Sequence, residues 1–110
     1  MAYDEGLAQR VREVLEEDQP AVVEKKMFGG IAFLVQGNMC CGVLNDVLIV
    51  RVGPDGYPAA IGKPHTRVFD LTGRPMKGWV VVTSAGYESD EALEGWVQQG
   101  VEFALTLPEK

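Results

Sequence analysis

The sequence predicts a two-layer α+β domain in which helices pack on one mainly antiparallel sheet of five strands. Three short apolar runs between residues 31 and 52 each end in a turn signal. That spacing is typical of an antiparallel meander. Segments with the periodicity of amphipathic helices stand near both ends of the chain, as expected for helices laid over a sheet. The expected order of elements is α-βββ-(α)-ββ-α.

The first helix is predicted by apolar residues that recur at helical spacing from Leu7 to Leu15. Asp4 is placed to cap its amino terminus, and Pro20 prevents it from continuing beyond about Asp18.

The meander strands are predicted at 31–35, 39–44 and 47–52, and two further strands at 67–70 and 78–83. We expect a short helix at residues 57–61.

A longer helix is predicted after Ser89, where six apolar residues share one broad face. Gly95 and Gly100 weaken it by up to about 1 kcal/mol each relative to Ala, unless close packing requires them.

The 110 residues are expected to form one domain, 1–110. Hydrophobic residues make up 46% and charged residues 24%, which is ordinary for a globular protein. No apolar run approaches the roughly 20 residues of a membrane span. Acidic residues follow Met1 where a secretory signal would carry basic ones. We therefore expect a reduced, cytoplasmic protein without a membrane segment.

The formal net charge of −6 is unevenly distributed. Residues 1–24 and 84–110 each carry a net −5, whereas residues 25–83 carry +4. An anionic partner would have to bind the middle of the chain. Direct binding to DNA is not expected, because no predicted helix has a basic face and the overall charge opposes phosphate contact.

The runs at 31–35 and 47–50 do not alternate apolar and polar residues, so both faces of these strands should be shielded from water. The predicted helices can cover only one face. We expect the second face to be covered by another copy of the protein, as a homodimer, or by a partner chain.

Gly29 and Gly30 do not form a phosphate-binding loop, since such a loop follows a strand, opens a helix and carries Gly-Lys-Ser/Thr. We expect instead a tight entry into the sheet and close packing of a helix over it.

Cys40 and Cys41 lie in the middle of a predicted strand, so one thiol should point to each face. Catalysis would need a base at the thiol, and a metal site would need more ligands; His65 is the only imidazole. Buried cysteines that act as small hydrophobic residues are the commoner outcome. No catalytic residue, metal site or cofactor is predicted.

The segment from residue 63 to 79 concentrates the candidate site residues. A site for an anion or a protein partner would use Lys63, His65, Arg67, Arg74, Lys77 and Trp79. Arginines would grip carboxylate or phosphate, and the tryptophan would stack beside them. In the structural alternative, Arg74 pairs with Asp70, Pro75 fixes the turn, and the lysines are solvated.

Three segments carry a resemblance to a known family: Lys26-Met27-Phe28-Gly29-Gly30, Gly37-Asn38-Met39 and Gly73-Arg74-Pro75-Met76-Lys77-Gly78-Trp79. With this separation, the sequence resembles the amino-terminal domain of the bacterial TfoX/Sxy family from about residue 5 to 106. The family's namesake regulates competence for DNA uptake. The resemblance implies an α+β domain and a role in transcription regulation through protein partners. It supplies no catalytic residues.

The namesakes carry a second, helical carboxy-terminal domain. In contrast, this chain is expected to be a stand-alone amino-terminal domain. The leading interpretation is a non-enzymatic interaction or regulatory module, a homodimer in the cytoplasm. The alternative is a small-molecule binding protein or small enzyme that holds an anionic ligand with the basic residues of 63–77.

Overall fold

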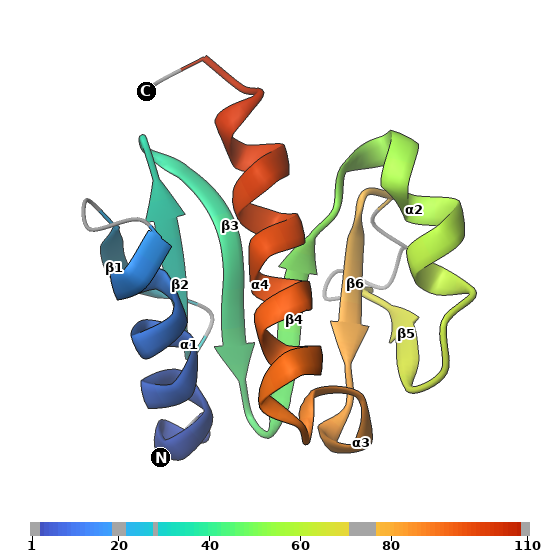
Figure 1. Cartoon of the computed structure of the whole chain (residues 1–110), viewed down its shortest axis with the longest axis horizontal. Helices are drawn as coiled ribbons and strands as arrows, with labels where there is room; N and C mark the ends of the chain where they lie inside the picture. Colours follow the sequence, from blue (N-terminus) through green and yellow to red (C-terminus); the bar gives the residue numbers. More distant parts are fainter. Residues whose placement is uncertain (1–2, 19–21, 28, 71–76, 109–110) are drawn as a thin grey trace.

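The computed structural model describes residues 3–18, 22–27, 29–70 and 77–108. In this part of the chain, one antiparallel sheet of six strands carries helices on one face (Figure 1). The strand order is β1-β2-β3-β4-β6-β5. The predicted α+β class is confirmed, with six strands in place of five.

The helices are α1 (Glu5–Asp18), α2 (Gly53–Ile61), α3 (Ser84–Tyr87) and α4 (Asp90–Leu105). The strands are β1 (Val23–Met27), β2 (Gly30–Val35), β3 (Asn38–Leu44), β4 (Val47–Arg51), β5 (Thr66–Val68) and β6 (Trp79–Val82).

Both long helices begin at side-chain caps. Asp4 Oδ1 accepts a hydrogen bond from the Leu7 amide at 3.1 Å, and Ser89 Oγ accepts one from the Ala92 amide at 3.1 Å. Each cap satisfies an amide that has no partner inside its helix. The predicted starts of both helices are therefore confirmed.

Strand β1 was not predicted, because it has no apolar run. It is an edge strand whose residues Val23 to Lys26 are exposed, and it pairs with β2 from Val23↔Leu34 onward. Glu24 ties it to α1, since the Arg12 guanidinium donates to both carboxylate oxygens at 2.6 and 2.8 Å. Edge strands need only one partner and often carry charge.

Helix α2 begins at Gly53, not at residue 57, and Pro54 stands in its first turn. Proline is favoured there because its missing amide would have no partner in the helix. The Gly-Pro pair therefore starts a helix where the sequence suggested only a turn.

The glycine pair lies at the entry to β2. Gly29 has φ +77°, and a side chain on Gly30 would come within 2.3 Å of the Val43 carbonyl oxygen. The expected tight entry is confirmed, but the close neighbour is strand β3 and not a helix.

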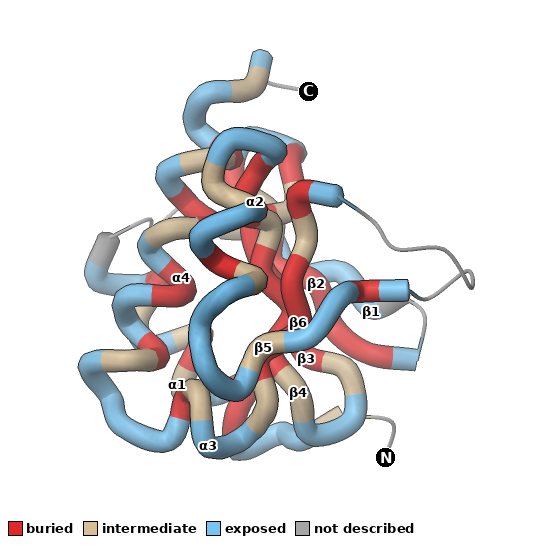
Figure 2. Tube along the Cα trace, turned by 90° about the vertical axis from the view of Figure 1, so that its right-hand side faces the viewer, coloured by how far each residue is buried: buried red, intermediate tan, exposed pale blue. Residues whose placement is uncertain are grey.

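The two faces of the sheet differ. The larger core lies under α1, α2 and α4, and includes Phe33, Leu48 and Val97, all fully buried. A smaller cluster of Ile49, Phe69 and Val81 lies on the other face. Figure 2, which looks at the sheet from its β5 edge, shows α1 and α4 on one side of it.

Helix α4 lies against strand β3 at Gly100. A side chain there would come within 2.3 Å of the Cys40 carbonyl oxygen, whereas one on Gly95 would meet nothing within 4 Å. Close packing therefore requires Gly100 but not Gly95.

We predict opposite effects for two alanine substitutions in α4. Gly95→Ala should stabilise the protein by about 0.5–1 kcal/mol, because alanine loses less backbone entropy in a helix. Gly100→Ala should destabilise it by about 1–3 kcal/mol through overpacking against β3. Urea unfolding measures both, and equal effects of the two substitutions would contradict this packing.

We also predict a pH effect from the Arg12–Glu24 pair. The hydrogen bond from Arg12 lowers the pKa of Glu24 below its usual value. The stability that ionised Glu24 gives to the folded state is therefore present above its pKa in the unfolded state. This stability is lost as pH falls through its lower pKa in the folded state. Glu24→Gln should remove the loss of stability at acid pH that this pair causes. Unfolding at several pH values measures this loss. The effect should not exceed about 1 kcal/mol, because the pair is exposed.

Candidate interaction site

The face of the sheet opposite α1 and α4, the open face, carries a continuous set of apolar side chains. Cross-strand pairs place them together: Leu34 with Met39, Leu44 with Val47, and Ile49 with Val81. Paired residues of an antiparallel ladder point to the same face. Strands β2 and β4 therefore carry apolar residues on both faces, which is why their runs do not alternate apolar and polar residues. Leu34, Met39, Leu44 and Val47 are half-buried.

A hollow of about 350 Å³ lies on the open face at the ends of β4 and β5. Ile49 and Val81 are buried beside it, Leu44 and Val47 form its apolar wall, and Phe69 also lines it. Apolar surface therefore surrounds a concave site, as expected where another molecule binds.

Arg67 is the cation of this hollow. It lies opposite Val81 in the β5–β6 ladder, so it shares the face of Ile49. Its side chain is exposed, and no hydrogen bond or ion pair joins it to another described residue. Asp70 also lines the hollow and is exposed, yet the two groups are not ion-paired. Among the described residues, the hollow thus presents one positive and one negative side chain that are not paired with each other.

Among the described residues, Lys63 and His65 do not converge on Arg67. The Lys63 ammonium lies over the Trp96 ring at 4.9 Å from its centroid, and Trp96 belongs to the core on the helix side. His65 lies next to Gly86 of α3, and its backbone carbonyl accepts hydrogen bonds from Thr83. Lys63 and Arg67 therefore face opposite sides of the sheet.

Trp79 lies on the open face, where it packs against the cluster of Ile49, Phe69 and Val81, but it does not line the hollow. Its ring lies 6.1 Å from that of Phe69, and the Arg51 guanidinium is 5.2 Å from Trp79 and 5.3 Å from Phe103. Arg51 therefore serves a structural stack, and Trp79 is already occupied by it.

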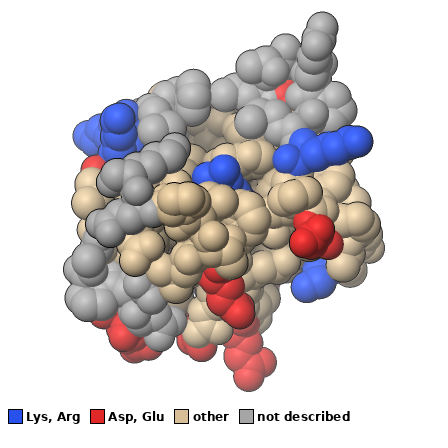
Figure 3. All heavy atoms as spheres, turned by 90° about the horizontal axis from the view of Figure 1, so that it is seen from above, with Lys and Arg blue, Asp and Glu red and all other residues tan. Residues whose placement is uncertain are grey.

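Lys77 is exposed next to Gly78, and Arg74 lies outside the described residues, so its predicted pairing with Asp70 is not tested. In the view from above, lysine and arginine atoms occupy separate places and not one patch (Figure 3).

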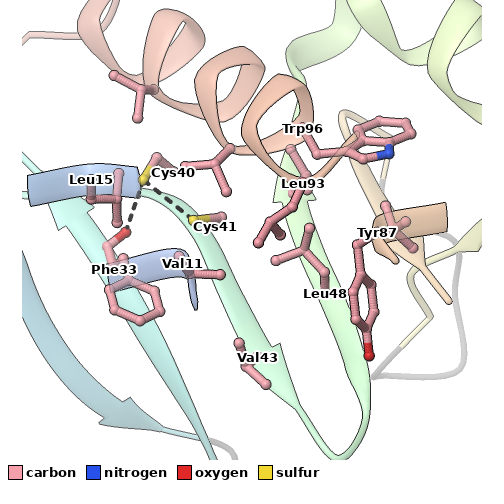
Figure 4. Close-up of a cluster of buried hydrophobic side chains, with 14 of the residues drawn as sticks. Val11, Leu15, Phe33, Cys40, Cys41, Val43, Leu48, Tyr87, Leu93 and Trp96 are labelled. Carbon is pink, nitrogen blue, oxygen red and sulfur yellow. Dashed lines mark hydrogen bonds between the residues drawn. The ribbon is translucent and has the colours of Figure 1, made fainter. Parts of the chain in front are cut away.

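The thiols of Cys40 and Cys41 both lie in the core on the helix side, so the expectation of one thiol on each face is wrong. Phe33 pairs with Cys41 and Leu34 with Met39, which leaves Cys40 as the extra residue of a β-bulge. The bulge interrupts the alternation of side chains. Figure 4 shows the two sulfurs side by side, 3.7 Å apart.

Negative charge gathers on the helix layer. Helices α1 and α4 line a second hollow, of about 160 Å³, with Glu13, Glu17 and Glu94. Arg10 at its edge pairs with Asp90 at 3.2 Å. The acidic ends of the sequence therefore meet in one layer, away from the open face.

Within the described ranges, no group of three or more metal-binding side chains comes together. In the same ranges, no helix has the length and apolar composition needed to cross a membrane.

The model of the TfoX N-terminal domain family matches residues 13–104. The chain belongs to the TfoX N-terminal domain family. This match confirms the resemblance that the glycine and Arg-Pro-Met-Lys-Gly segments indicated. No curated protein and no solved structure matches the chain significantly.

Sequence reasoning found Arg67 but missed its surroundings. Leu44 and Val47 lie about twenty residues before it, and they line the same hollow because β4 and β5 both pair with β6. The unbroken apolar runs were the available signal, and they predicted the face but not the position of the hollow.

We predict that the two arginines of the open-face strands differ in their effect on stability. Arg51→Gln should lose about 1–2 kcal/mol, because it removes a cation from between two rings. Arg67→Gln should change stability by less than about 0.5 kcal/mol, because it has no partner in the described chain. Thermal or urea unfolding compares them, and a large loss from Arg67→Gln would show that this residue has a structural role.

Proposed function

We propose that this protein is a non-enzymatic regulatory module that binds protein with its open face, in the manner of the competence regulators after which its family is named. The supporting observation is the hollow around Arg67, where half-buried apolar side chains surround a cation without a partner among the described residues. Apolar surface of this kind marks interaction sites on soluble proteins.

A second copy of the chain is the occupant that the charges favour. The carboxylates of α1 and α4 lie on the helix layer, and Asp70 is the acidic residue of the hollow. Two copies joined through their open faces hold their acidic helices on the outside, far from each other. Pairing through the β1 edge would bring two α1 helices together and place like charges side by side.

The ionic groups of the hollow suit a two-fold interface. In such an interface, residue i contacts residue j of the partner, and j contacts i in return. Arg67 of each copy would then meet Asp70 of the other. Each copy contributes one arginine and one aspartate that are not paired with each other, so two ion pairs can form and neither charge is buried alone.

The alternative, a site for a small anion, has less support. Lys63 and Arg67 lie on opposite faces, and the hollow itself contains the Asp70 carboxylate, which repels anions. His65 lies beside α3, whereas the thiols lie in β3 under α4, so the imidazole is not placed to act as a base for either thiol.

We predict that the protein sediments as a dimer at high micromolar concentration. Val47→Glu should give a folded monomer, because it places a charge on the apolar wall of the interface. Leu105→Glu is the matched control: Leu105 is 43% exposed on α4, and its variant should remain dimeric. A monomeric wild type, or a dimer unaffected by Val47→Glu, would contradict self-association through the open face.

A charge exchange tests the reciprocal pairs. Arg67→Glu and Asp70→Arg should each weaken the dimer by about two- to thirtyfold, because each variant breaks two ion pairs between exposed side chains, worth about 0.2–1 kcal/mol each. The double variant should recover most of that loss, because each charge meets its opposite again. Sedimentation equilibrium gives the dissociation constants, and a double variant as weak as the sum of the single variants would reject this pairing.

A further inference from the structure

We propose that Cys40 and Cys41 are a redox modification site, at which a peroxide converts the two thiols reversibly into a disulfide between neighbouring residues. The site lies in the core on the helix side and does not depend on the proposed function.

The bulge creates the geometry that such a disulfide needs. In a regular strand, neighbouring side chains point to opposite faces, and adjacent cysteines cannot meet. Here both sulfurs point to the same side and lie 3.7 Å apart. Cys40 has no opposite residue in the β2–β3 ladder, so its backbone can change conformation without breaking a register pair.

The two thiols are also chemically different. The hydrogen bond with Cys41 lowers the pKa of Cys40, whereas the hydrogen bond with Cys40, together with burial, raises the pKa of Cys41 well above its usual value. Because the thiolate is the reactive form, Cys40 is the nucleophile and Cys41 the resolving thiol.

The chemistry needs hydrogen peroxide as the oxidant. The Cys40 thiolate attacks one peroxide oxygen, the O–O bond breaks, and hydroxide leaves and takes up the proton that Cys40 released, which gives a sulfenic acid on Cys40 and one water. The Cys41 sulfur then attacks the Cys40 sulfur, the S–O bond breaks, and the hydroxyl leaves as water with the Cys41 proton. The sulfurs lose one electron pair to peroxide, and the net products are one disulfide and two waters.

The product is easily reduced. Neighbouring Cα atoms lie about 3.8 Å apart, below the roughly 4.4 Å at which ordinary disulfides begin. The ring is therefore strained, and strained disulfides have the more oxidising potentials typical of regulatory sites. In addition, the Cys40 thiol donates a hydrogen bond to the Phe33 carbonyl at 3.4 Å, and oxidation removes this donor. The oxidised protein should therefore unfold at a lower temperature than the reduced one.

Access depends on helix α4. Both cysteines are fully buried, and Gly100 of α4 rests on the Cys40 backbone. Peroxide reaches the pair when α4 opens, which Gly95 favours because glycine weakens a helix without a packing benefit at that position.

Mass spectrometry of the peptide that contains both cysteines tests the proposal on the folded full chain. After hydrogen peroxide treatment, the peptide should lose the mass of two hydrogens, and dithiothreitol should restore it. Cys41→Ser should accumulate a sulfenic acid on Cys40 that dimedone traps, whereas Cys40→Ser should give several-fold less adduct. Disulfides between chains, or thiols left intact in peroxide until the protein is unfolded by urea, would overturn the proposal.

Gly95→Ala tests the route by which peroxide enters. It should slow disulfide formation by about two- to fivefold, since it stabilises the closed helix. An unchanged rate would show that opening of α4 is not the route. This variant retains both cysteines and the bulge, so it remains informative even where a cysteine variant folds poorly.

Oxidation should also change the amide environment of residues on the open face. Met39 precedes the bulge and pairs with Leu34 there. In reduced and oxidised samples, the amide resonances of Leu34 and Met39 should differ more than those of Leu44 and Val47. Equal shifts at all four amides would contradict a change centred on the bulge, and this readout does not require the protein to dimerise.

Discussion

The approach of helix α4 to strand β3 is the contact on which the rest of the structure depends. It is possible because Gly100 has no side chain: a Cβ would come within 2.3 Å of the Cys40 carbonyl oxygen. Seated there, α4 buries Leu93, Val97 and Val101 over the sheet and provides the surface against which α1 packs. The helices consequently gather on one face, and the bulge at Cys40 is held beneath them.

This arrangement divides the molecule into two unlike surfaces. The helix layer exposes the carboxylates of α1 and α4, such as Glu13 and Glu94, whereas the open face exposes apolar side chains around Arg67 and Asp70. A surface that is apolar and nearly balanced in charge can meet another such surface without repulsion. A surface rich in carboxylates cannot meet its own copy in this way. The fold therefore places the surface rich in carboxylates and the apolar surface on opposite sides of the sheet.

Physical reasons decide what the sequence could and could not predict. The runs at 31–35 and 47–50 predicted strands with two shielded faces, because residues that are buried on either face of a sheet are mostly apolar and leave an unbroken apolar run in the sequence. Strand β1 was missed, since an edge strand such as Val23 to Lys26 is held by backbone pairing and needs no apolar pattern. The bulge at Cys40 was missed because it depends on the register between two strands, which one strand's sequence does not contain.

The candidate site shows the same limit. Lys63 and Arg67 are close in the sequence, but the chain enters β5 between them, and they end on opposite faces of the sheet. Arg67 instead lines the same hollow as Leu44 and Val47, because β4 and β5 both pair with β6. Grouping basic residues by sequence distance therefore joined Lys63 to Arg67, although the fold places them on opposite faces of the sheet.

The central claim is that the open face is covered by a second copy of the chain. Isotope-filtered nuclear Overhauser spectroscopy on a mixture of labelled and unlabelled protein tests it most directly, because only contacts between copies give a signal. We expect contacts among the methyl groups of Leu44, Val47 and Leu34 across the two copies. Contacts that instead join residues of α1 or α4, or the β1 edges, would contradict the claim.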